Sequence, residues 1–178
     1  MSAALKFHLV VAENEKEICS VEIGQNELDA LVSYLADIPA NAPLFDCLTR
    51  HPAAEVRKSV AQKNQLSMES ILSLIQDPDR EVRSYAMRRE KFAQSATLEQ
   101  LRDLIDSDVW LAREVARNID EFSGVDLGEL CALLIAHPDP SVALELADGY
   151  STPKNVLRSL LKHPELSVSR AAEEKLAN

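Results

Sequence analysis

HPAAEVR at residues 51–57 and DPDREVR at residues 77–83 are two copies of one motif, and this motif decides the fold. Each copy has a turn residue, a proline and polar residues, then Val-Arg, with an apolar residue four positions after the valine. A proline that follows a helix ends it, and apolar residues four positions apart lie on one face of the next helix. The motif therefore predicts a loop that leads into a short amphipathic helix.

Three further copies follow downstream, so the motif is a repeat. Its valine position is occupied in turn by Val56, Val82, Leu111, Val142 and Val168. The residue four positions later is always apolar: Val60, Ala86, Val115, Leu146 and Ala172. A repeat of about 26 to 31 residues is typical of stacked helical arrays, in which each unit buries the apolar face of its neighbour.

A second helix is expected before each loop. The expected ranges are 44–50, 68–76, 98–105, 127–136 and 153–162. Thr97 and Asp126 each precede a Gln or Glu by three residues, which is the pattern of a capping box. Ser141 and Ser167 are predicted to cap the helices that follow the fourth and fifth loops.

The first part of the chain has a different pattern. Leu5, Phe7, Leu9 and Val11 alternate with other residues, residues 13–16 are polar, and apolar residues resume by Ile18. Alternation around a polar turn predicts a β-hairpin over about residues 5–23, and a helix is expected over 27–37. We therefore divide the chain into residues 1–43, a hairpin with a capping helix, and residues 44–178, a repeat domain, within a single compact unit.

With the loop motif, the two-helix unit and the period in place, residues 44–178 resemble HEAT-like repeat proteins. The resemblance is closest to the short bacterial repeats called leucine-rich repeat variants. The matching residues are Pro52, Val56, Arg57, Pro78, Val82, Arg83, Pro138, Val142, Pro164 and Val168. The resemblance implies a mainly α fold, a right-handed α-solenoid of about five short helix pairs with an N-terminal β-hairpin.

The resemblance implies no activity, because the residues shared in such repeats are structural. One protein of this kind carries an iron–sulfur cluster on clustered cysteines that precede its repeats. Only Cys19 and Cys47 lie in the corresponding half of this chain, so that cluster is not implied. We expect no cofactor.

The formal net charge of −10 disfavours a general binder of nucleic acid or of an anionic membrane. The charge is uneven, because residues 50–91 contain nine Lys and Arg against six Asp and Glu. No apolar run approaches the roughly 20 residues that span a bilayer, and the first residues lack the apolar stretch of a leader. Three cysteines without a CxxC pair predict buried free thiols in a cytoplasmic protein.

No set of residues typical of catalysis is recognisable, and four glycines leave little material for a phosphate-binding loop. We therefore expect no enzyme. His51, His137 and His163 recur at one loop position, which invites a metal site. The equivalent position is Asp77 or Asp106 in other copies, so we interpret these residues as hydrogen-bonding partners of the loop backbone and expect no metal site.

The outer face of the second helix of each pair is the candidate binding surface. It is predicted to line a groove that is basic over the first three repeats. Its candidate partner-binding residues are Lys58, Lys63, Arg88, Arg89, Trp110, Arg113 and Arg117. The prediction is a non-catalytic protein–protein interaction scaffold that binds an acidic segment of a partner. Arg57 and Arg83 lie beside the apolar stripe, where we expect them to bind a carboxylate or a helix-end carbonyl of a neighbouring repeat.

Two alternatives remain at this stage. Some HEAT-like proteins are DNA glycosylases that act on alkylated bases, and the basic segment suits contacts with phosphates. The net charge elsewhere in the chain and the lack of an aromatic cluster make nucleic acid the less favoured partner. The other alternative is a small acidic inhibitor or immunity-like protein that acts through the edge of the hairpin. The sequence leaves the oligomeric state open.

Overall fold

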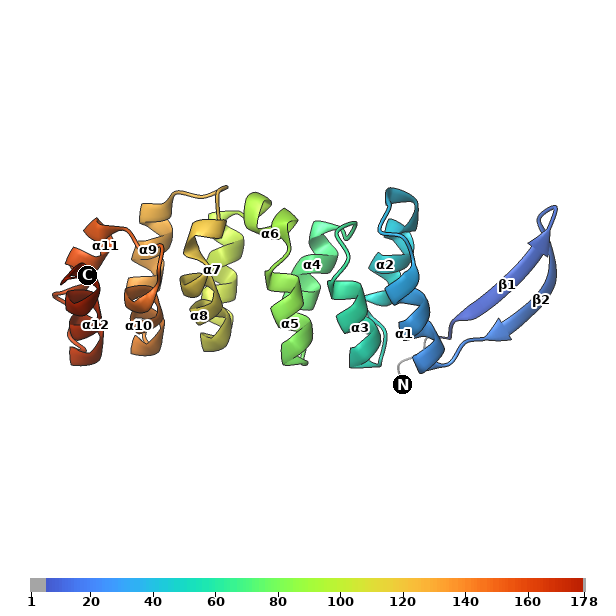
Figure 1. Ribbon diagram of the computed structural model, residues 1–178, viewed down its shortest axis with the longest axis horizontal. Helices are drawn as coiled ribbons and strands as arrows, with labels where there is room; N and C mark the ends of the chain where they lie inside the picture. The colour runs from blue at the N-terminus through green and yellow to red at the C-terminus, as the bar shows by residue number, and fades with distance from the viewer. Residues whose placement is uncertain (1–5, 178) are drawn as a thin grey trace. The chain divides into compact units, whose positions relative to one another are not determined.

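Residues 6–177 are described by the computed structural model, which is mainly α-helical with one two-stranded antiparallel sheet (Figure 1). The predicted class, mainly α with an N-terminal β-hairpin, is confirmed. The chain divides into two compact units, Met1–Phe92 and Ala93–Asn178. The boundary expected near residue 43 lies inside the first unit and stays a prediction.

The hairpin consists of β1 (His8–Glu13) and β2 (Lys16–Glu22). Asn14 and Glu15 connect the strands with φ angles of 49° and 66°. Two successive residues in the left-handed region form the tight turn whose twist matches that of paired strands. The predicted position of the turn is confirmed, whereas Leu5, the start of the predicted alternation, lies outside the described residues.

The hairpin joins the helices only near its base. Phe7, just before β1, lies 5.3 Å from the ring of His51, measured between ring centroids. The backbone N–H of Ile23 donates to the carbonyl of Phe7 at 2.8 Å, which extends the ladder by one pair. Every residue of β1 and β2 is exposed, and Leu31 of α1 lies across an open cavity from Leu9 and Val21.

The helices of the N-terminal unit pack in sequence order and also against the next helix but one. They are α1 (Gln25–Tyr34), η1 (Pro39–Asn41), α2 (Ala42–Leu48), α3 (Ala54–Ala61), α4 (Met68–Ile75) and α5 (Arg80–Met87), followed by α6 (Glu90–Ser95) at the boundary. Helices α1, α3 and α5 form a row in which each contacts the next, and α3 also contacts α2 and α4. This is the packing expected of stacked helix pairs.

The C-terminal unit repeats that arrangement. Its helices are α7 (Leu98–Ser107), α8 (Val109–Arg117), η2 (Ile119–Glu121), α9 (Leu127–Ile135), α10 (Pro140–Asp148), α11 (Lys154–Leu160) and α12 (Leu166–Ala177). Helices α8, α10 and α12 form one row of contacts, and α7, α9 and α11 form a second row. Two rows of short helices therefore bury one another's apolar faces.

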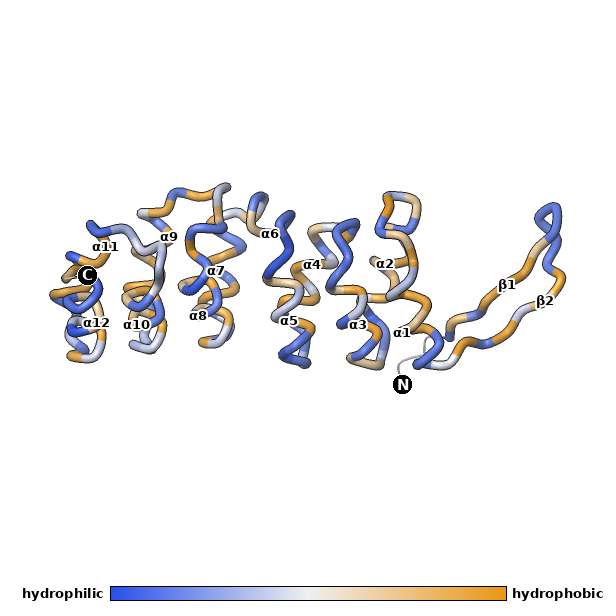
Figure 2. Tube along the Cα trace, viewed as in Figure 1, coloured by the Kyte–Doolittle hydropathy of each residue, from blue (hydrophilic) through white to orange (hydrophobic). Residues whose placement is uncertain are grey.

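The repeated motif supplies the core of both units. All five residues at its valine position are at most 2% exposed, and the five apolar residues four positions later are fully buried. The predicted spacing is thereby confirmed. Hydrophobic and hydrophilic residues alternate along the helices in Figure 2, as expected for amphipathic helices that bury one side.

A buried ion pair joins two successive loops of the N-terminal unit. Arg57 donates to the Asp77 carboxylate from Nε at 2.6 Å and from Nη2 at 2.8 Å. Its Nη1 donates to the carbonyl of His51 at 2.7 Å. These bonds to Asp77 raise the pKa of Arg57. The role expected of Arg57, a bond to a neighbouring repeat, is thereby confirmed. Arg83 donates to the Asp77 carbonyl in the loop of its own repeat at 2.8 Å, so its bond to a neighbouring repeat stays a prediction.

Aspartates cap more helices than the sequence indicates. Thr97 caps α7 in a full capping box and Asp126 caps α9, as predicted. The prediction for Ser141 is wrong, because Asp139 caps α10 by accepting from the Ser141 N–H at 2.9 Å. The prediction for Ser167 is also wrong, because that residue lies inside α12. Asp139 lies two residues before Ser141, at the position directly preceding α10, where its carboxylate meets the first free N–H groups.

The cysteines do not all behave as predicted. Cys131 is buried in α9, and burial raises the pKa of its thiol to about 11. Cys19 and Cys47 are exposed free thiols, so the expectation of burial is wrong for them. Cys19 lies on a strand that no other element covers, and Cys47 has an exposed position on α2. Within residues 6–177, no helix is both long enough and apolar enough to cross a membrane.

Candidate functional site

The predicted basic residues of the N-terminal unit are largely engaged within the unit. The Nζ of Lys58 lies 3.0 Å from Glu81 Oε2 and also pairs with Glu55. Hydrogen bonds to these two carboxylates raise the pKa of Lys58 above its ordinary range. Arg88 is exposed at the C-terminal end of α5. Of the predicted cations in this unit, Arg88 is therefore the one most open to solvent.

Lys63 and Arg89 join neighbouring helices through backbone carbonyls. Lys63 is only 9% exposed and donates from Nζ to the Leu35 carbonyl, just after α1, at 3.0 Å. Arg89 donates from Nη1 to the Gln62 carbonyl, just after α3, at 2.6 Å. Burial lowers the pKa of Arg89. Both side chains satisfy carbonyls near helix ends, which is a structural use of positive charge.

The predicted residues of the C-terminal unit share one helix. Trp110, Arg113 and Arg117 lie on α8 at intervals of three and four residues, which places them on one face. Trp110 is half-buried. The side chains of Arg113 and Arg117 are 43% and 49% exposed. This face is the largest group of predicted site residues that one element brings together.

Both arginines hold the same carboxylate. Arg113 Nη2 lies 2.9 Å from Glu145 Oε2, and Arg117 Nε lies 2.8 Å from Glu145 Oε1. Burial raises the pKa of Glu145, but the two guanidiniums lower it by more, so it lies below its ordinary value. Arg117 also pairs with Glu114. The α8 face is thus a preformed carboxylate site occupied by a side chain of α10.

A cavity of about 410 Å³ adjoins the Arg117–Glu145 ion pair. The residues that line it are Arg117, Asp120, Glu145, Asp148, Gly149, Tyr150 and Ser151. Tyr150 is 98% exposed, and the Nζ of Lys175 lies 4.3 Å from the centre of its ring. We call the surface formed by Trp110, Arg113, Arg117, Glu145 and Tyr150 the α8 surface. Glu145 and Tyr150 were not predicted, because they lie outside the helix positions that mark the expected groove.

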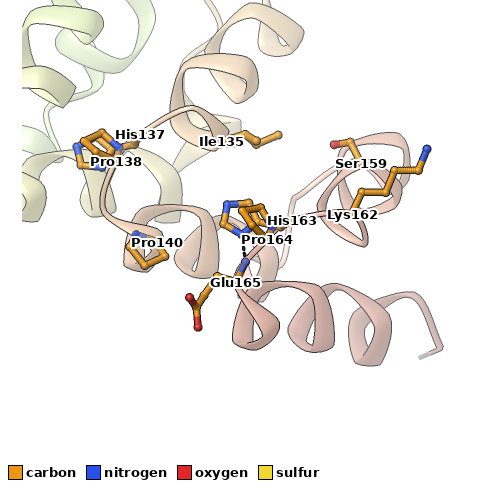
Figure 3. A pocket seen from close by; sticks show the side chains of 9 residues that line it. All are labelled: Ile135, His137, Pro138, Pro140, Ser159, Lys162, His163, Pro164 and Glu165. Atoms are coloured by element: carbon orange, nitrogen blue, oxygen red, sulfur yellow. Dashed lines mark hydrogen bonds between the residues drawn. The ribbon is translucent and has the colours of Figure 1, made fainter.

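The recurrent histidines lie in a different cavity, of about 560 Å³, which His137, His163 and Lys162 line together with several prolines (Figure 3). His137 Nδ1 accepts from the Asp139 N–H at 3.0 Å, and His163 Nδ1 accepts from the Glu165 N–H at 3.2 Å. Asp77 Oδ1 makes the same bond with the Asp79 N–H at 2.8 Å. The interpretation of these residues as partners of the loop backbone is confirmed.

This use of Nδ1 leaves one ring nitrogen, Nε2, on each histidine for other contacts. Among residues 6–177, no three His, Cys, Asp or Glu side chains cluster closely enough to hold a metal ion. The histidine cavity therefore offers isolated hydrogen-bonding groups and a cation, whereas the α8 surface combines aromatic rings with paired charges.

A scan against protein-family models, a search of curated proteins and a search of solved structures each found no match for this chain.

Proposed function

We propose that this chain is a HEAT-like repeat protein, closest to the leucine-rich repeat variant type, and that its helices form a right-handed α-solenoid of about five short pairs. The recurrence of one buried aliphatic position in α3, α5, α8, α10 and α12 supports this proposal. The rows α1–α3–α5 and α8–α10–α12 support it further, because each helix contacts its equivalent in the next pair.

We further propose that the protein is a non-catalytic interaction scaffold of the cytoplasm whose α8 surface binds an acidic segment of a partner protein. The observation that carries this proposal is the Glu145 carboxylate held between Arg113 and Arg117. A partner carboxylate meets the same pair of guanidiniums when it competes with Glu145. Trp110 and the exposed ring of Tyr150 supply the aromatic contacts that dominate many protein interfaces. The exposed free thiols Cys19 and Cys47 support a reducing compartment.

The other predicted residues take different places in this proposal. Arg88 is the exposed predicted cation of the N-terminal unit, whereas Lys58 is paired with Glu55 and Glu81. Lys63 and Arg89 have a structural role, because each donates to a backbone carbonyl near the end of a neighbouring helix. A test of the function therefore uses residues of the α8 surface, whose replacement leaves those helix contacts intact.

The test is capture of partner proteins from a lysate of the native host, read by mass spectrometry. The double variant Arg113→Gln/Arg117→Gln and the single variant Tyr150→Ala are expected to lose captured proteins that the wild type retains. Glu145→Gln is expected to capture more of the same proteins, because it removes the internal competitor for the guanidiniums.

Matched controls separate binding from folding. Arg102→Gln removes an exposed arginine from α7, and Tyr34→Ala removes a ring that is 91% exposed on α1. Both are expected to capture as the wild type does. Adding Glu145→Gln to the double arginine variant removes the unpaired carboxylate and restores the melting temperature without restoring capture. Unchanged capture by the double arginine variant would refute the proposed site.

A further inference from the structure

The hairpin has one apolar face and one polar face. The register pairs Leu9 with Val21 and Val11 with Cys19, and directly paired residues share a face. These four residues form the apolar face, and Leu9 and Val21 are 55% and 60% exposed. His8 and Ser20 hydrogen-bond on the opposite face. The apolar face also lines a cavity of about 540 Å³, which Leu31 of α1 completes.

The two edges of the hairpin differ in how well they are protected. Strand β2 carries Lys16, Glu17 and Glu22, and the ladder is irregular where Ile18 stands opposite no residue of β1. Charges and bulges are the devices by which sheet edges avoid pairing with other chains. Strand β1 has four successive uncharged residues, 9–12, without proline and without an extra residue. The β1 edge is therefore open to strand addition.

The ladder determines which backbone groups point toward this open edge. The backbone N–H of Ile23 donates to the carbonyl of Phe7, so the N–H and C=O groups of Phe7 point toward β2. The direction of these groups alternates from residue to residue along an antiparallel strand. His8, Val10 and Ala12 consequently direct their N–H and C=O groups outward. A strand that pairs with β1 forms its hydrogen bonds with these three residues.

We propose that the occupant of the β1 edge is β1 of a second copy of this chain, paired antiparallel about a two-fold axis at Val10. In this register Val10 pairs with its own symmetry equivalent, and His8 pairs with Ala12 of the other copy. Leu9 of one copy then lies opposite Val11 of the other. The two apolar faces join into one face of a four-stranded sheet.

The charges of the strand favour this occupant. Lys6, just before β1, is a cation that also pairs with Glu22 at 3.0 Å, and Glu13 and Glu15 make the other end of the strand acidic. Antiparallel pairing of two copies brings the basic end of each beside the acidic end of the other, whereas parallel pairing opposes like charges. A two-stranded hairpin is marginally stable in water, and four strands with one apolar face exceed the number that independent stability requires.

The test is the mass of the full chain in solution, measured by analytical ultracentrifugation under reducing conditions, which exclude disulfides through Cys19 and Cys47. The wild type is expected to have twice the 19.7 kDa of one chain. Val10→Lys places two like charges opposite each other at the axis and is expected to give monomers. Ser20→Lys puts the same charge on the same face of the hairpin but on the β2 edge, and it is expected to remain a dimer.

A charge-swap experiment distinguishes a broken interface from a misfolded hairpin. Val10→Glu alone is expected to be monomeric, and an equimolar mixture of Val10→Lys and Val10→Glu is expected to restore the dimer. A monomeric wild type would overturn the proposal. Loss of the dimer in Ser20→Lys, or no rescue in the mixture, also overturns it. Dimerisation is independent of the α8 surface, so Arg113→Gln/Arg117→Gln is expected to remain dimeric.

Discussion

The N-terminal and C-terminal units use the same chemistry, guanidinium to carboxylate, in two environments. In the N-terminal unit the side chains of Arg57 and Asp77 are 11% and 6% exposed, and the pair joins successive loops. In the C-terminal unit Arg113 and Arg117 are nearly half exposed, although they hold Glu145 at similar distances. The two ion-pair sites therefore differ in how far their arginine side chains are exposed to solvent.

This difference separates a structural ion pair from a site that is able to exchange partners. Removing one member of a buried pair leaves the other charge without water or partner, which is strongly destabilising. An exposed guanidinium regains water when it loses its carboxylate, so exchange costs little. The Arg57 pair therefore stabilises the fold, and the Glu145 cluster is the one suited to binding.

The largest expected effect is that of Asp77→Ala. This change leaves Arg57 as an unpaired buried charge and removes the bond to the Asp79 N–H, so we expect the free energy of unfolding to fall by about 3 to 5 kcal/mol. Urea denaturation followed by circular dichroism measures the change. Glu69→Ala removes an exposed carboxylate from α4 and is the control, with an expected change within about 0.5 kcal/mol. Equal effects of the two variants would show that burial of the Asp77 pair is unimportant.

A smaller effect is expected of Glu145→Gln. Because its arginine partners are nearly half exposed, the loss of unfolding free energy is expected to be at most about 1 kcal/mol. Added salt is expected to shrink this loss by screening the exposed charges. The control is Glu173→Gln, which removes an exposed carboxylate from α12. A loss as large as that of Asp77→Ala, insensitive to salt, would place the cluster in the same class as the Arg57 pair.

The smallest expected effect is the pH dependence of the unfolding free energy that is lost in Glu145→Gln. The pKa of Glu145 lies below its ordinary value of 4.5 in the folded chain, so its stabilisation is present above that value. The stabilisation disappears as the pH falls through the lowered pKa, because the carboxylate then protonates. We expect wild type and Glu145→Gln to differ most near neutral pH and to converge as the pH falls through the lowered pKa of Glu145. A constant difference in urea denaturation across this range contradicts the assignment.

The helical part of the fold follows closely from the sequence, because its signals are local. The valine of each repeat and the apolar residue four positions later define a buried stripe, whatever lies around them. The turn between the strands is equally local, since Glu13 to Lys16 is a polar interval between two apolar runs. The cap of α10 was mispredicted because Asp139 and Ser141 are both good caps, and only the path of the loop selects between them.

The candidate site follows from the sequence less completely. The positions of Arg113 and Arg117 on one helix face are predictable from helical spacing. Their carboxylate partner is not, because Glu145 belongs to another helix and meets them only after α8 packs against α10. Lys63 and Arg89 also appear equivalent to Arg88 in the sequence. Packing distinguishes them, because it brings the carbonyls of Leu35 and Gln62 within reach of two of these cations.

The sequence by itself determined where the repeated helices and the two strands lie and which side of each repeated helix is apolar. Both depend on the spacing of residues a few positions apart. The sequence did not indicate the short helix α6 or the 3-10 turns η1 and η2. Only the tertiary structure decided which charged side chains are paired within the molecule and which hairpin residues are exposed. Pairing and burial depend on residues that are distant in the chain, and a paired charge exchanges its partner at little cost only where water reaches it.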